Sequence, residues 1–150
     1  MSVEIHTKGL DELTRRMSEY PDKLDRGMKE TTDATLLTLW ENVPSYPSPP
    51  ADSEYRRTGT LGRSLGGGEG GGRSGGQPDI YATTKIGGGW EGRFGTRTNY
   101  APYVIGDSTQ AWVHKGRWWV MSDIVKAAQP KIEKLWSALA SAMKDFLERQ

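Results

Sequence analysis

Apolar side chains recur every three or four residues in two long stretches of the chain, one near each end. This spacing predicts helices within residues 10–43, interrupted at Pro21, and an amphipathic helix over 122–148. Because proline lacks the amide hydrogen that a helix interior needs, Pro130 is expected to break or kink the second stretch, and Ser122 is a candidate N-cap. The first stripe is Leu24, Met28, Thr35, Leu36, Leu39, Trp40 and Val43, and the second is Ile132, Leu135, Trp136, Leu139, Met143, Phe146 and Leu147.

A pattern of period two lies between the helices and predicts an antiparallel hairpin. Its first strand spans 80–86, a turn of three glycines follows, and the partner strand is expected over 93–106 with Pro102 as a bulge or strand end. A further short strand pair is expected over 112–120 around Gly116. The pattern therefore predicts an α+β fold, in which a small antiparallel sheet accompanies a long N-terminal helix and a C-terminal amphipathic helix. One side of the first strand carries Ile80, Ala82, Thr84 and Ile86.

Proline and glycine dominate residues 44–78, which separate the first helices from the hairpin. Four of the eight prolines fall at the start of this region, and fifteen of the nineteen glycines lie between Gly59 and Gly95. Because neither residue favours helix or sheet interiors, a long Gly-rich loop is predicted. Within it, 55–65 is interpreted as a docking segment and 66–77 as a flexible loop tip, although a surface loop without a role explains the polyglycine equally well.

The composition fits a single domain over 1–150, with the hairpin region at 79–120. Hydrophobic residues make up 35% of the chain, and there are six tryptophans, a residue enriched at the centres of protein interfaces. The formal charge is only +1, but residues 1–50 carry nine acidic and six basic side chains, whereas 51–119 carry nine basic and six acidic ones. The basic excess suits nucleic acid or an acidic protein face, and it is equally typical of a solvated surface.

The absence of cysteine excludes disulfides and thiolate metal sites. No apolar stretch approaches the roughly 20 residues that span a bilayer. The sequence also does not open on a signal-peptide pattern. We therefore expect no membrane association.

No motif for nucleotide, metal or hydrolytic chemistry is well formed. The glycine-rich stretch lacks the spacing and the lysine of a P-loop, and neither a strand nor a helix flanks it as that motif requires. The two histidines, His6 and His114, are far apart and have no partner at metal-ligand spacing. A trio of Ser108, His114 and Asp123 is a chance occurrence at this chain length, since no nucleophile elbow accompanies it. We expect no catalytic residue, no cofactor and no metal.

Arginines interleave with aromatic residues in the middle of the chain, which is one way of binding single-stranded nucleic acid. No RNP pattern, zinc finger or helix-turn-helix signature accompanies them. Arginine and tryptophan are also enriched in the hot spots of protein interfaces, so the same residues support a protein partner. The set comprises Arg56, Arg57, Arg63, Arg73, Arg93 and Arg97 with Tyr55, Trp90 and Phe94.

Four motifs occur in order along the chain. They are GLDEL at 9–13 after a short VEI arm, a long helix ending in NVP at 42–44, RTGTLGRS at 57–64 and NYAPYVIGD at 99–107. The third is similar to the pattern R-T-G-x-L-x-x-S and the fourth to Y-A-x-Y-V-x-x-G. Taken together, the motifs resemble the small bacteriophage tail-completion, or head–tail joining, protein family over nearly the whole chain. The glycine insert at 66–76 and the sequence DSTQAWVHKGRWWVMSD, which stands where many members have P-F-L-R-P-A, depart from that family.

The resemblance implies an α+β subunit that assembles with copies of itself into a ring at the head–tail junction or the proximal end of the tail tube. Such a subunit is a structural virion protein and not an enzyme. Its partners would be phage connector, neck or tail-tube proteins, with packaged DNA as a further contact. It would reside in the virion neck or tail, and in the host cytoplasm during assembly. By position, Arg57, Thr58, Gly59, Leu61 and Ser64 correspond to the first pattern, and Tyr100, Ala101, Tyr103, Val104 and Gly106 to the second.

The residues expected to contact partners come from these motifs and from the tryptophan-rich segment that follows. Two alternatives remain beside the structural role: a single-stranded nucleic-acid-binding module that uses the Arg/aromatic middle segment, and a small hydrolase at His114. The expected contact residues are Arg56, Arg57, Thr58, Leu61, Arg63, Tyr100, Tyr103, Trp112, His114, Trp118 and Trp119.

Overall fold

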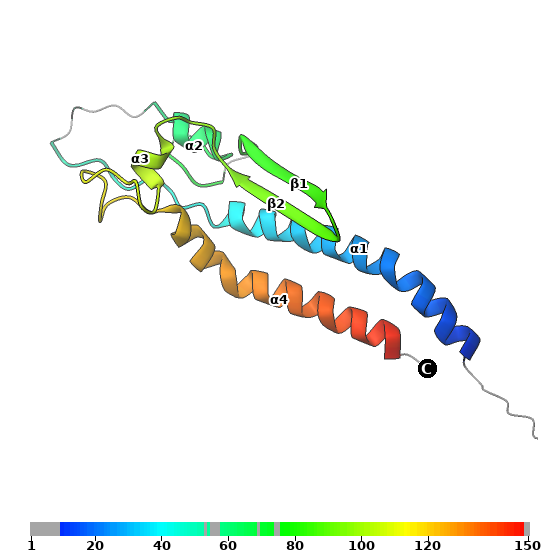
Figure 1. The fold of residues 1–150 in the computed structure, drawn as a ribbon. Coiled ribbons are helices and arrows are strands. Elements are labelled where there is room, and N and C mark those ends of the chain that lie inside the picture. The colour runs from blue at the N-terminus through cyan, green and yellow to red at the C-terminus, as the bar shows by residue number, and fades with distance from the viewer. Residues whose placement is uncertain (1–9, 53, 55–57, 69, 74–75, 149–150) are drawn as a thin grey trace, which may run out of the picture.

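Two long antiparallel helices and one β-hairpin form the frame of the molecule (Figure 1). The computed structural model describes residues 10–52, 54, 58–68, 70–73 and 76–148. The elements follow in the order α1 (Leu10–Glu41), α2 (Thr60–Ser64), β1 (Ile80–Ile86), β2 (Gly89–Gly95), α3 (Ala101–Ile105) and α4 (Met121–Glu148). Helices α1 and α4 lie side by side, and the hairpin of β1 and β2 lies along α1. The predicted α+β class is confirmed.

Helix α1 is continuous through Pro21, whereas the sequence suggested separate helices on either side of it. A proline removes one hydrogen bond from the helix interior, but ion pairs span the preceding turns: Arg15 lies 2.7 Å from Glu12 and 2.6 Å from Glu19. The hydrogen bond from Arg15 is also the main reason that the pKa of Glu12 is lowered to about 2. The helix ends at Glu41, close to its expected end.

The hairpin confirms the strand predicted over 80–86 and corrects its partner. β1 pairs antiparallel with β2 in a register that sets Ile80 opposite Gly95. The expectation of a partner strand over 93–106 is wrong, because β2 starts earlier, at Gly89 within the expected turn, and ends at Gly95. The turn is tight enough for its third glycine, Gly89, to pair with Ile86, so the second strand begins and ends earlier in the sequence than expected.

The chain after β2 is helical or turned rather than extended. Residues 101–105 form α3, because Pro102 suits the first turn of a helix, where no backbone donor is needed. The strand pair expected over 112–120 is also wrong, since successive turns occupy this segment and Gly116 has a φ of 74°. Several of its backbone N–H groups donate to carbonyls three or four residues back, so they are used locally instead of in a ladder.

One face of the hairpin rests on α1. Thr83 donates a hydrogen bond to Asp33 at 2.6 Å, and Trp90 donates one to Asp25 at 3.1 Å. The Lys85 ammonium lies 3.0 Å from Asp25 and is the main reason that the pKa of this carboxyl is lowered. The side of β1 that the period-two pattern grouped together points away from α1; it carries Ile80, Ala82, Thr84 and Ile86.

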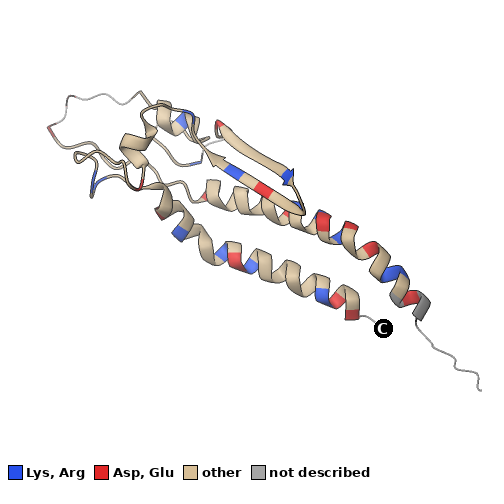
Figure 2. Cartoon of the chain, viewed as in Figure 1, with Lys and Arg blue, Asp and Glu red and all other residues tan. Residues whose placement is uncertain are grey.

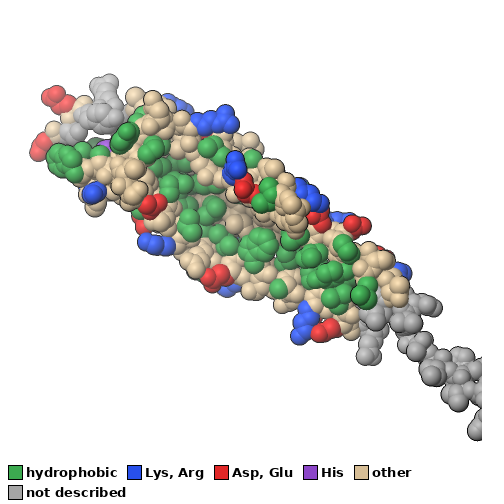
Figure 3. Space-filling view, viewed as in Figure 1, with side chains coloured by type: hydrophobic (Ala, Val, Ile, Leu, Met, Phe, Trp, Pro, Cys, Tyr) green, Lys and Arg blue, Asp and Glu red, His purple; other side chains and the backbone are tan. Residues whose placement is uncertain are grey.

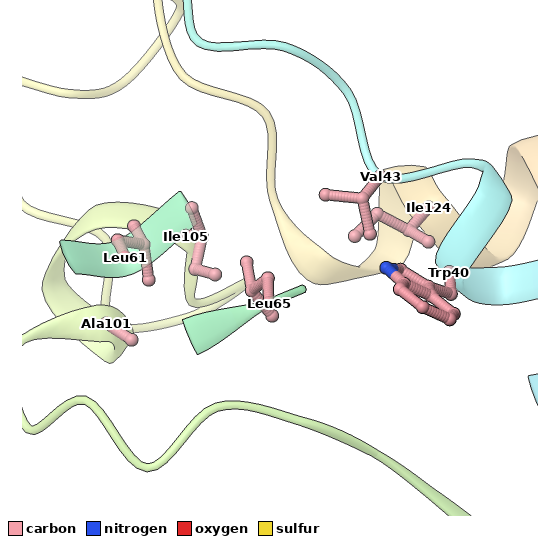
Figure 4. Packing of buried hydrophobic residues seen from close by; sticks show 7 residues of the cluster. All are labelled: Trp40, Val43, Leu61, Leu65, Ala101, Ile105 and Ile124. Atoms are coloured by element: carbon pink, nitrogen blue, oxygen red, sulfur yellow. The ribbon is translucent and has the colours of Figure 1, made fainter. Parts of the chain in front are cut away.

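The buried core lies at one end of the long helices. This end, called the tip from here on, comprises the described residues among 42–79 and 96–120. Trp40 from α1 and Ile124 from α4 reach into the core, so it joins the long helices to α2 and α3 (Figure 4). Its seven members are Trp40, Val43, Leu61, Leu65, Ala101, Ile105 and Ile124.

Helix α4 begins one residue earlier than predicted and is not broken by its proline. It starts at Met121, so Ser122 is not its N-cap. The carboxylate of Asp123 instead accepts the Val120 N–H at 3.0 Å, which satisfies a donor that the first turn leaves unpaired. The helix then continues through Pro130.

Candidate functional site

The described part of the first motif segment, 58–64, and the second motif segment, 99–107, are distant in sequence and pack together at the tip. A hydroxyl network joins the first segment to the residues just before the second: Ser64 Oγ lies 2.6 Å from the Thr96 hydroxyl and accepts a hydrogen bond from Thr98 at 3.0 Å. Ser64 is itself buried, so these bonds are shielded from water. The other buried side chains of the two segments are Leu61, Ala101 and Ile105.

Helix α2 presents the first motif as a single turn. Gly59 precedes it with a φ of 69°, a left-handed conformation that costs glycine little. Arg63 donates a hydrogen bond to the Thr58 carbonyl at 2.7 Å and so closes the motif loop on itself. Leu61 is only 3% exposed, which places this expected contact residue in the core rather than on the outer surface.

Part of the glycine-rich stretch that was interpreted as a flexible loop tip packs against the rest of the tip: Gly66 and Gly67 are buried, whereas Gly70, Arg73, Gly76 and Gln77 are exposed. A Cβ atom at Gly67 would lie 1.9 Å from the Gly72 carbonyl oxygen, so no larger residue fits there. The Tyr46 N–H donates to the Gly70 carbonyl at 2.7 Å and ties the stretch to the proline-rich segment. The glycines therefore permit close backbone packing.

Glu41 at the end of α1 binds basic side chains from two other segments. Its carboxylate lies 3.1 Å from Arg73 in the glycine-rich stretch and 2.9 Å from Lys131 in α4. The hydrogen bond from Lys131 is the main cause of the lowered pKa of Glu41. Arg73 also stacks over the Trp40 ring at 4.6 Å. Arg73, one of the arginines of the nucleic-acid alternative, is thus engaged within the chain.

Helix α3 turns the tyrosines of the second motif outward. Tyr100 and Tyr103 are 40% and 61% exposed. The Gln110 amide fixes the chain that follows, because it donates to the carbonyls of Val104 at 2.8 Å and Trp118 at 3.2 Å. The motif therefore offers two aromatic rings on a backbone that is held in place.

A cavity of about 500 Å³ opens at the tip between α2, α3, the proline-rich segment and the turns of 112–120. Its wall is aromatic: the Trp118 ring lies 4.9 Å from that of Tyr46 and 5.9 Å from that of His114, between centroids. An apolar lining with few polar groups is typical of sites that bind a ligand or a partner's side chain. The lining residues are Tyr46, Pro49, Pro50, Thr58, Gly59, Thr60, Leu61, Tyr100, Tyr103, Val104, Val113, His114, Arg117 and Trp118.

The structure brings six of the expected contact residues together around this cavity: Thr58, Leu61, Tyr100, Tyr103, His114 and Trp118. Arg63 and Trp119 do not line it, and Trp112 stands beside it, 86% exposed. Arg56 and Arg57 lie outside the described residues. Sequence reasoning missed Tyr46, Pro49, Pro50, Val113 and Arg117. The signal for the first three was an aromatic residue set within the proline run PSYPSPP.

The tip does not assemble the hydrolytic trio. His114 Nδ1 is buried and has no hydrogen-bond partner among the described residues. Asp123 is used to cap α4, and Ser108 is exposed. Over the part of the chain that the structure describes, no group of three or more His, Asp or Glu side chains could hold a metal ion. None of the helices described is both long and apolar enough to cross a membrane.

The residues of the nucleic-acid alternative face in different directions. Trp90 packs towards α1, where the ammonium groups of Lys29 and Lys85 lie 5.8 and 5.7 Å from its ring. Arg93 lies on the opposite face of the same strand and pairs with Glu91. These aromatic and basic side chains therefore do not form one stacking surface.

A second apolar surface runs between α1 and α4 away from the tip (Figure 3). The predicted stripe of α4 packs on α1 with one edge only, which leaves Trp136 39% and Leu147 38% exposed. Charged residues of both signs occur along the length of the two helices (Figure 2). The surface is hollowed into a groove of about 530 Å³, called the distal groove from here on. Its lining residues are Tyr20, Leu24, Met28, Trp136, Leu139, Ala140, Met143, Lys144 and Leu147.

The cavity at the tip is the feature best suited to a partner. Exposed tyrosines stand at its mouth, and tyrosine, tryptophan and arginine are the residues that interface hot spots favour. Comparison with protein-family models, with curated proteins and with solved structures gave no match to this chain.

Proposed function

We propose that this chain is a structural virion protein: a tail-completion or head–tail joining subunit that oligomerises into a ring at the phage neck or proximal tail. The observation that carries the proposal is the meeting of the segments RTGTLGRS and NYAPYVIGD, which resemble two patterns of that family, at one surface. The Ser64 hydroxyl accepts a hydrogen bond from Thr98, the residue just before the second segment, and residues of both segments line the same cavity. If the two motifs serve the same interface, their residues must lie on one surface, as they do here.

The two apolar surfaces of the molecule support this role. In a ring, each subunit contacts its two neighbours through different patches, because the interface is head-to-tail. The tip and the distal groove are two such patches, well separated along the long helices. Both expose large apolar side chains, such as Tyr103 at the tip and Trp136 in the groove. Monomeric proteins rarely leave surfaces of this kind uncovered.

The test is genetic complementation in the phage whose genome encodes the chain. Without the chain, we expect filled heads and tails to accumulate separately, and the wild-type chain should restore tailed particles. A chain with Trp136→Ala and Leu147→Ala should keep its helical circular dichroism but fail to restore them. The matched control is Thr84→Ala, on the outer face of β1, which should restore particles fully. A normal yield of tailed particles without the chain would overturn the proposal.

A further inference from the structure

Trp112 is the most exposed of the large hydrophobic side chains described, at 86%. Its backbone is held by turns: the Trp112 carbonyl accepts the Lys115 N–H at 3.3 Å, and the neighbouring Ala111 N–H donates to the Tyr103 carbonyl at 2.8 Å. A large indole on an ordered backbone and open to water is unfavourable for an isolated chain, because its apolar area is worth burying. This arrangement suits a side chain that inserts into a partner.

The tip cavity lies next to Trp112 and is not filled by it. Val113 and His114, the two residues that follow Trp112, line the cavity, but the indole itself does not. The exposed rims of Tyr103 and Val113, 61% and 46% exposed, continue the apolar surface from the cavity to the tryptophan. The exposed indole of Trp112 and the aromatic cavity of about 500 Å³ thus belong to the same surface patch.

A patch that carries both a projection and its hole can match a second copy of itself across a two-fold axis. In such a contact, residue i of one chain meets residue j of the other and the reverse contact forms as well. A single chain then contributes everything that the interface needs. In such a contact the indole of each copy would enter the cavity of the other and meet the aromatic wall that Trp118 and Tyr46 form.

The charges at the tip fit the same arrangement. Lys115 and Arg117 are exposed on the turns beside Trp112, and Asp52 and Glu54 are exposed on the proline-rich side. Side chains of both signs border the apolar patch at this end of the molecule (Figure 3). Arg117 also reaches the proline-rich segment, where it donates a hydrogen bond to the Ser48 carbonyl at 3.4 Å. In a two-fold contact, basic side chains at the tip of one copy can therefore pair with Asp52 and Glu54 of the other.

We propose that two copies of the chain associate tip to tip, with Trp112 of each inserted into the aromatic cavity of the other. The contact goes beyond the ring proposed above, which needs no two-fold pairing. It covers the tip, so the free dimer would withhold that surface from assembly until a stronger partner displaces it. This last consequence rests on the proposed function, whereas the dimer itself does not.

The first experiment is sedimentation equilibrium of the purified full-length chain over a wide concentration range. We expect a monomer–dimer equilibrium, which Trp112→Ala weakens roughly 30-fold or more because the indole is the centre of the contact. The control is Trp136→Ala, which removes an equally large ring from the distal groove and should leave the dimer constant unchanged. A monomer at every concentration, or a dimer that Trp112→Ala does not weaken, would overturn the proposal.

Charge reversal tests the two-fold arrangement separately. Lys115→Glu and Asp52→Lys should each weaken the dimer at low salt, and the double variant should recover most of the loss because the two reversed charges face one another across the axis. A double variant weaker than either single variant would show that these side chains do not meet. The complementation assay is independent of both measurements, so the dimer can fail while the ring proposal stands, and the reverse.

Discussion

Gly92 of β2 lies directly against Leu36 of α1. A Cβ atom at Gly92 would stand 3.0 Å from Leu36 Cδ2 and 3.0 Å from the methyl group of Thr32, closer than side chains normally approach. Leu36 is almost fully buried at 2% exposure, and it is buried because the hairpin comes this near. The absence of a side chain at one position of the strand therefore sets the spacing between hairpin and helix.

Gly92→Ala should destabilise the fold by about 1–3 kcal/mol, the usual cost of adding a methyl group to a well-packed contact. The control is Gly89→Ala in the same strand, where an added Cβ meets nothing within 4 Å. Urea denaturation of both variants measures the difference. Equal stabilities for the two variants would mean that the hairpin does not pack on α1 at this distance.

Ser64→Ala should cost about 1–3 kcal/mol, because it removes the partner that the hydroxyls of Thr96 and Thr98 have in the first motif segment. An exposed serine of α4, Ser137, provides the control, and Ser137→Ala should change stability by less than about 0.5 kcal/mol. Thermal unfolding compares them. If Ser64→Ala matched the control, the hydroxyl network would contribute nothing to the fold.

Gly67→Ala should prevent normal folding of the tip. The added methyl group would meet the Gly72 carbonyl oxygen, which belongs to the backbone and cannot rotate away. Gly70→Ala lies in the same stretch with open space around it and should be tolerated. Limited proteolysis reports the difference, since a disturbed tip should be cut faster. Equal resistance of the two variants would restore the view of this stretch as a flexible loop.

The Asp25–Lys85 contact should make stability depend on pH below about pH 4. Because the pKa of Asp25 is lowered in the folded chain from its ordinary value of 3.8, the contact stabilises the fold above that pH and is lost as the pH falls through the lowered value. Asp25→Asn should therefore lower the urea midpoint at neutral pH and lose this deficit in acid. A deficit of the same size at every pH would show that the charge on Asp25 is not what ties the hairpin to α1.

The elements that could be predicted from the sequence are those with a long repeat of apolar positions or with turn residues directly beside them. The stripes of α1 and α4 and the alternation of β1 needed no tertiary information. Helix α3 was missed because Pro102 suits both a strand end and a helix start, and α3 packs in the same core as Leu61 of α2. The packing of the glycine-rich stretch was missed for a related reason. A high glycine content predicts backbone flexibility, whereas close packing depends on which segments lie next to the glycines in the folded chain.

The candidate site was predictable in part. Tyr100, Tyr103 and Trp118 were singled out from their motifs and their residue types, and they line one cavity. Leu61 was expected to meet a partner but is buried, because a motif position does not distinguish packing from contact. Tyr46 was missed, since only the tertiary structure brings it beside Trp118.

Lys23 near the start of α1 lies 4.0 Å from the ring of Phe146 near the end of α4. During translation, Phe146 is added more than a hundred residues after Lys23, so this contact cannot form until most of the chain has been made. At roughly 5–20 residues per second, the nascent α1 waits on the order of ten seconds for its partner. Throughout that time the apolar stripe of α1 is exposed to neighbouring nascent chains on the same mRNA. This protein should therefore aggregate first on crowded polysomes and as truncated translation products that lack α4.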